Sequence, residues 1–66
     1  MGRPNYTIES IINYCKNEES GIEKEIYEYL IDIKHNNKLL YENLAIEIKN
    51  QDFDDILDIA IYLGVL

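Results

Sequence analysis

The chain has 66 residues, of which 47% are hydrophobic and 29% are charged. That length fills one domain with a small core, and the hydrophobic content excludes an intrinsically disordered tail. Thirteen acidic residues against six basic residues give a net charge of −7, which argues against bare nucleic acid as the partner.

The first predicted element is a short helix over about residues 8–17. Thr7 is suited to cap its amino end, because a Thr side chain can accept a hydrogen bond from a backbone N–H of the first turn. Ile8, Ile11 and Cys15 recur at helical spacing and predict the buried side of this helix. Residues 1–6 precede it and are expected to form a short amino-terminal arm.

The second predicted helix covers about residues 21–35 and is the longest of the set. Ser20 and Glu23 have the spacing of a capping box, in which each side chain accepts a hydrogen bond from the backbone N–H of the other residue. Apolar residues then follow at helical spacing. The helix is expected to end near His35, and Asn37 is suited to cap the next one.

The third predicted helix covers about residues 38–50. Its main apolar stripe includes Leu44 and Ile48, whereas Leu39 and Ile46 fall away from that stripe. The apolar surface of this helix is therefore wider than a single helix contact needs.

The fourth predicted helix covers about residues 53–63. Asp52 is suited to cap its amino end, and Gly64 is suited to end it. No segment of the chain alternates apolar and polar residues over the length of a strand. The sequence therefore predicts an all-α fold, a single small domain over residues 1–66. Its four short helices form either a bundle or an orthogonal array.

Motifs for catalysis or metal binding are weak in this sequence. Asp54, Asp55 and Asp58 match the DDxxD spacing by which isoprenoid synthases hold magnesium and a diphosphate, but such enzymes need a larger helical cavity than this chain can enclose. Cys15 lies on an apolar stripe, and His35 suits the carboxyl end of a helix. The sequence therefore predicts no enzyme, no metal site and no cofactor.

The strongest functional features are surface features of the second and third helices. Glu25, Glu28 and Asp32 share one face of the second helix, while Tyr27 and Ile31 form an apolar strip beside its main stripe. The six tyrosines of the chain suit the half-buried shell of a small domain as well as an interface. The residues expected to contact a partner are Tyr27, Ile31, Glu25, Glu28, Asp32 and Tyr41.

These features favour a non-catalytic protein-binding module, a small acidic regulator or inhibitor that docks on a larger basic partner. A structural homo-oligomer, such as a homodimer, and a small DNA-binding transcriptional regulator are the alternatives, although the charge makes direct nucleic-acid binding unfavourable. The composition, rich in Ile, Asn, Lys and Glu, suits a phage or mobile-element accessory protein that acts on a host defence or DNA-processing protein. The lone Cys15 and the lack of a long apolar run predict a cytoplasmic protein without membrane contact.

Overall fold

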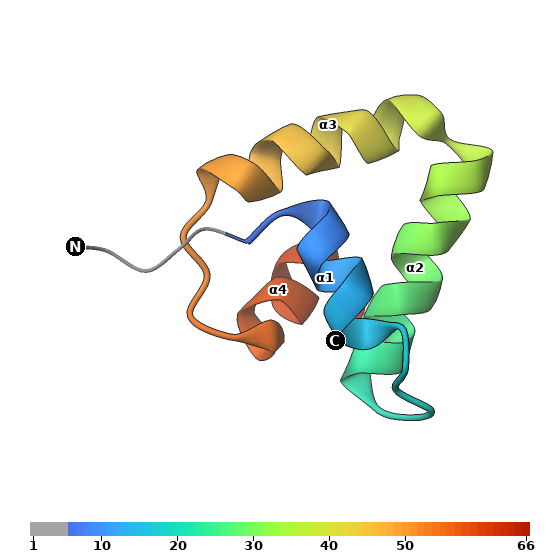
Figure 1. The fold of residues 1–66 in the computed structure, drawn as a ribbon. Coiled ribbons are helices and arrows are strands. Elements are labelled where there is room, and N and C mark those ends of the chain that lie inside the picture. The colour runs from blue at the N-terminus through green and yellow to red at the C-terminus, as the bar shows by residue number, and fades with distance from the viewer. Residues whose placement is uncertain (1–5) are drawn as a thin grey trace.

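The computed structural model describes residues 6–66 and contains four helices (Figure 1). They are α1 (Ile8–Cys15), α2 (Ile22–Asn36), α3 (Lys38–Asn50) and α4 (Ile56–Leu63). No strand occurs in this part of the chain. The predicted all-α fold with four helices is therefore confirmed. Of the predicted arm over residues 1–6, all but Tyr6 lies outside the described residues.

Helix α1 begins as the sequence predicts. The Thr7 side chain accepts a hydrogen bond from the backbone N–H of Ser10 at 3.1 Å, and the Ser10 side chain accepts one from the backbone N–H of Thr7 at 3.0 Å. The helix ends at Cys15, earlier than predicted, because the backbone N–H of Glu18 turns back onto the Cys15 carbonyl at 3.1 Å.

The predicted capping box of Ser20 and Glu23 does not form. Gly21 is the residue that precedes α2, and no side chain caps this helix. Gly21 has φ of 91° and ψ of −168°, a backbone conformation that is essentially restricted to glycine. Because the helix begins one residue after Gly21, Ser20 is out of register for the predicted cap.

Asn37 both ends α2 and begins α3. Its backbone N–H donates to the Ile33 carbonyl at 2.8 Å, and its side chain accepts from the backbone N–H of Leu40 at 3.3 Å. The predicted cap at Asn37 is thus confirmed.

Helix α4 begins at Ile56, later than the predicted start at residue 53. Asp55, not Asp52, caps it and accepts a hydrogen bond from the backbone N–H of Asp58 at 3.2 Å. The Asp58 side chain in turn accepts from the backbone N–H of Asp54 at 3.1 Å. The carboxylates of Asp55 and Asp58 in the DDxxD string therefore satisfy backbone groups at a helix start.

The carboxyl end of α4 follows the prediction. Gly64 adopts the left-handed conformation at φ of 81°, and its N–H donates to the Ala60 carbonyl at 3.0 Å. The N–H of Val65 donates to the same carbonyl at 3.1 Å. This turn sends the last two residues back along the molecule.

The core lies inside the angle formed by α2 and α3, which run in different directions in Figure 1. Helix α1 packs against both of them, and α4 packs against α2. Phe53 is buried although it precedes α4, because its ring makes edge contacts with Tyr6 at 6.5 Å and Tyr62 at 5.5 Å between ring centroids. The buried residues are Ile8, Ile11, Cys15, Ile26, Leu30, Ile33, Ile48, Phe53, Ile59 and Ala60.

Candidate functional site

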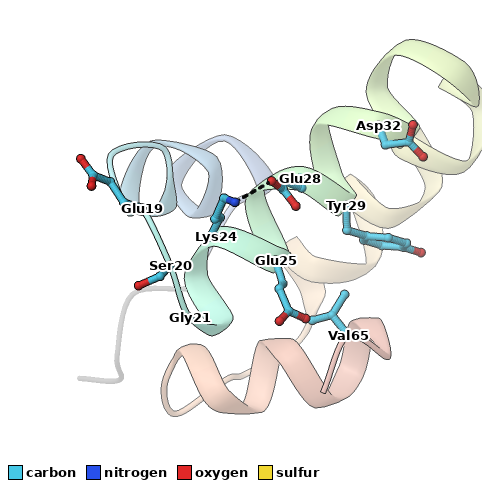
Figure 2. Close-up of a pocket in the computed structure, with 9 residues that line it drawn as sticks. All are labelled: Glu19, Ser20, Gly21, Lys24, Glu25, Glu28, Tyr29, Asp32 and Val65. Carbon is cyan, nitrogen blue, oxygen red and sulfur yellow. Dashed lines mark ion pairs between the residues drawn. The ribbon is translucent and has the colours of Figure 1, made fainter.

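The candidate site is an open groove of about 760 Å³ along α2 (Figure 2). It runs from the turn before α2 to the middle of this helix, and one side is formed by the tail that follows α4. Carboxylates and a tyrosine ring dominate the lining. The lining residues are Glu19, Ser20, Gly21, Lys24, Glu25, Glu28, Tyr29, Asp32 and Val65.

Helical geometry explains why the acidic residues share this groove. At 3.6 residues per turn, Glu25, Glu28 and Asp32 return to the same side of α2, and Tyr29 falls between that side and the core. Val65 reaches the groove from the far end of the chain, because the Gly64 turn directs the tail toward α2. The apolar part of the lining, formed by Tyr29 and Val65, therefore comes from two distant segments.

The groove is strongly negative. Lys24 is the cation in its lining, and its ammonium group lies 3.3 Å from a carboxylate oxygen of Glu28. Asp32 accepts a hydrogen bond of 2.6 Å from the side-chain amide of Asn36, which fixes its carboxylate without neutralising it. Glu19 and Glu25 are exposed and add two further negative charges. The groove consequently attracts cations.

The predicted contact residues divide into two groups. Glu25, Glu28 and Asp32 line the groove, as Figure 2 shows. Tyr27 and Ile31 are half-buried and lie on a different side of α2, and Tyr27 packs against the core. The six predicted residues therefore do not form one surface.

Tyr41, the sixth predicted contact residue, lies where α2 and α3 approach each other. Its side chain is half-buried against the core, and the Lys34 ammonium nitrogen lies 5.8 Å from the centre of its ring. Burial raises the pKa of Tyr41, and the negative charge of Glu9 on α1 raises it further. Tyr41 therefore lies at the junction of α1, α2 and α3 and does not line the groove.

Sequence reasoning missed six lining residues, namely Glu19, Ser20, Gly21, Lys24, Tyr29 and Val65. Tyr29 belongs to the apolar stripe of α2, and its place at the edge of that stripe is the signal that could have assigned it to the groove. Val65 has no local signal, because its position depends on how α4 packs against α2.

The two side chains suited to nucleophilic catalysis are far apart. Cys15 is fully buried, and burial together with the nearby carboxylates of Glu23 and Glu18 raises its pKa to about 11. His35 is exposed near the opposite end of α2 from Glu23, about 18 Å along the helix at 1.5 Å per residue. The thiol therefore stays protonated at neutral pH, and the imidazole of His35 is too distant to activate it.

Within residues 6–66, no group of three or more His, Cys, Asp or Glu side chains is placed to hold a metal ion. None of the described helices has the length and apolar character needed to cross a membrane.

Several large apolar side chains are exposed outside the groove. On α3, Leu39 is 70% exposed and Ile46 is 60% exposed. On α4, Leu57 and Ile61 are exposed one turn apart, and the Tyr62 hydroxyl donates a hydrogen bond to the Glu47 carboxylate of α3. The molecule thus presents an acidic surface on α2 and apolar surfaces on α3 and α4.

Comparison of the chain with protein-family models, with curated proteins and with solved structures finds no match.

Proposed function

We propose that this protein is a non-catalytic protein-binding module that takes a basic segment of a larger protein into the α2 groove. The observation that carries the proposal is the lining of the groove, where the carboxylates of Glu25, Glu28 and Asp32 line the same groove as the ring of Tyr29 and the side chain of Val65. The module would act as a regulator or inhibitor by covering the basic surface of its partner.

The chemistry of the groove fits arginine or lysine side chains. Their charged ends can pair with the carboxylates, while their aliphatic stems lie on Val65. A guanidinium group can also stack on the ring of Tyr29, which presents an apolar face beside the negative charges. A basic segment therefore meets both charge and apolar complementarity in one place.

The net charge of −7 extends this attraction beyond the groove. A field of one sign raises the rate at which an oppositely charged protein meets the surface, and salt weakens that effect. A partner whose own groove binds nucleic acid carries such a basic surface. A cytoplasmic host DNA-processing or defence protein is therefore the class of partner that we propose, and the action of a phage or mobile-element accessory protein fits it.

The test is binding of an arginine-rich, dye-labelled peptide of about 16 residues, followed by fluorescence anisotropy at low and physiological salt. A peptide of the same length with Glu in place of each Arg serves as the ligand control. The wild-type protein is expected to bind the basic peptide with an affinity that falls as salt rises, and to leave the acidic peptide unbound.

Two double variants with equal charge change locate the binding surface. Glu25→Gln with Asp32→Asn removes two groove carboxylates, whereas Glu9→Gln with Glu18→Gln removes two exposed carboxylates outside the groove. We expect the groove variant to bind about tenfold more weakly and the control variant to change affinity by less than about twofold. Equal losses in the two variants would show attraction to the net charge alone and would overturn the proposal.

A further inference from the structure

Within residues 6–66, no helix packs against the outer face of α3. Ile48 is the one residue of this helix that is buried, and α3 packs against α1 and α2. In Figure 1 it spans the top of the molecule, with α1 beneath it. Leu39 and Ile46 are seven residues apart, so they lie two turns apart on the same outer face. We call Leu39, Ile46 and the exposed Asn43 between them the outer strip of α3.

Formal charge separates α3 from the other three described helices, each of which is net negative. Helix α3 carries two lysines and two glutamates, so its formal charge is zero in a chain of −7. The exposed pair Leu57 and Ile61 lies on α4, whose only charged residue is Asp58. A basic partner gains nothing from the neutral α3, whereas a second copy of this acidic chain is repelled least there.

The order of the charges along α3 also favours self-pairing. Glu42 and Lys49 are seven residues apart, so they lie on the same side of the outer strip. When two copies of α3 pack in opposite directions about a two-fold axis, Glu42 of one copy lies beside Lys49 of the other, and symmetry repeats the contact. Parallel packing would instead place like charges together.

We infer that the outer strip of α3 is the contact surface of an antiparallel homodimer of this protein. In that arrangement Ile46 of each copy lies near the two-fold axis, and Leu39 covers the far end of the second copy's α3. The surface does not overlap the α2 groove, so the inference does not depend on the proposed function.

The size of the surface sets the strength of the dimer. A helix of 13 residues is about 20 Å long, so one helix pair buries less than the roughly 800 Å² per partner of a typical stable interface. The dimer is therefore weak, with a dissociation constant in the range of about 10 µM to 1 mM.

Sedimentation equilibrium of the full chain between about 10 µM and 2 mM tests the inference over the range in which such a dimer dissociates. The average mass is expected to rise from that of a monomer toward that of a dimer. A mass that stays monomeric over the whole range would overturn the inference, and so would a rise that continues beyond a dimer.

Matched variants identify the surface. Leu39→Ser with Ile46→Ser is expected to keep the helical circular dichroism and to remain monomeric, because both side chains are exposed before association. Leu57→Ser with Ile61→Ser removes two exposed apolar side chains from α4 and is expected to dimerise like the wild type. Loss of the dimer in the α4 variant alone would overturn the inference.

A charge exchange tests the antiparallel direction. Glu42→Lys is expected to weaken the dimer several-fold, because it places two positive charges beside each other at both symmetry-related contacts. Glu42→Lys together with Lys49→Glu restores opposite charges across an antiparallel pair and is expected to recover most of the affinity. Failure of the second change to recover it, with the helices intact, would contradict the antiparallel arrangement.

Discussion

Helices α2 and α3 follow each other with only Asn37 between them, and their lengths are 15 and 13 residues. Their outer surfaces nevertheless differ in kind. Helix α2 buries three residues and presents a row of carboxylates, whereas α3 buries one residue and presents exposed Leu39 and Ile46. The difference suits the two helices to the different partners proposed for them, a basic protein segment for the acidic α2 and a second copy of the chain for the neutral α3.

The largest expected effect concerns the stability that α3 gains from packing against the core. Ile48 is fully buried and is the one core residue of α3, so Ile48→Ala is expected to lower the free energy of unfolding by about 2–5 kcal/mol. Leu39→Ala on the outer side of the same helix is expected to change it by less than about 0.5 kcal/mol. Urea denaturation followed by circular dichroism measures both. Similar losses in the two variants would mean that the outer strip already has a partner within the molecule.

The next effect concerns how the helices begin, since Asn37 caps α3 with its side chain and Gly21 precedes α2 without one. Gly21→Ala is expected to cost about 1–3 kcal/mol, because a residue with a Cβ is strained at that φ and ψ. Asn37→Ala removes the cap of α3 and is expected to cost about 0.5–2 kcal/mol. Thermal denaturation of the two variants shows which substitution costs more stability. A Gly21→Ala variant as stable as the wild type would show that α2 begins differently.

A smaller expected effect is a pH dependence of stability, which follows from the titration of Cys15 near the acidic start of α2. The pKa of Cys15 is raised from its ordinary value of 9.0 to about 11, mainly by burial and then by Glu23 and Glu18. A raised pKa favours the protonated thiol in the folded state. The stabilising contribution is therefore complete below about pH 9 and is lost as the pH rises through about 11.

The urea midpoint of the wild type is accordingly expected to fall between pH 8.5 and pH 10.5 by more than that of Cys15→Ala, which has no thiol to titrate. The variant should still lose some stability above pH 10, because the pKa values of Tyr41 and Tyr62 are raised as well. Identical pH profiles for the wild type and the variant would contradict the burial of Cys15.

The smallest effect concerns the link between α3 and α4. The Tyr62 hydroxyl donates to the Glu47 carboxylate at an exposed position, so Tyr62→Phe is expected to cost less than about 1 kcal/mol. The same hydrogen bond is the main cause of the raised pKa of Tyr62. In ultraviolet titration, Glu47→Gln is therefore expected to lower the pH at which one tyrosine ionises, and an unchanged titration would show that the bond does not persist in solution.

Local sequence signals were sufficient for the number of helices and for several of their ends. Thr7, Asn37 and Gly64 each act through backbone groups within a few residues, so their roles follow from spacing alone. The start of α4 could not be chosen in the same way, because Asp52 and Asp55 are both suited to cap a helix. Contacts with Tyr6 and Tyr62 bury Phe53 outside the helix, and such contacts join segments distant in sequence.

The candidate site shows the same limit. The row of Glu25, Glu28 and Asp32 could be predicted, because the geometry of one helix places these residues together. The apolar wall of the groove could not be predicted, because Val65 lies about 30 residues or more away in the sequence from the acidic row and reaches the groove only through the packing of α4 against α2. The exposed state of Leu39 and Ile46 also depends on which side of α3 meets α1 and α2.

The most direct test of the difference between the two helices measures both activities in the same two variants. Glu25→Gln with Asp32→Asn is expected to lose about tenfold in affinity for the arginine-rich peptide while its sedimentation still shows a dimer. Leu39→Ser with Ile46→Ser is expected to bind the peptide normally and to sediment as a monomer. If either folded variant loses both peptide binding and self-association, the two surfaces are not separate and the central claim is wrong.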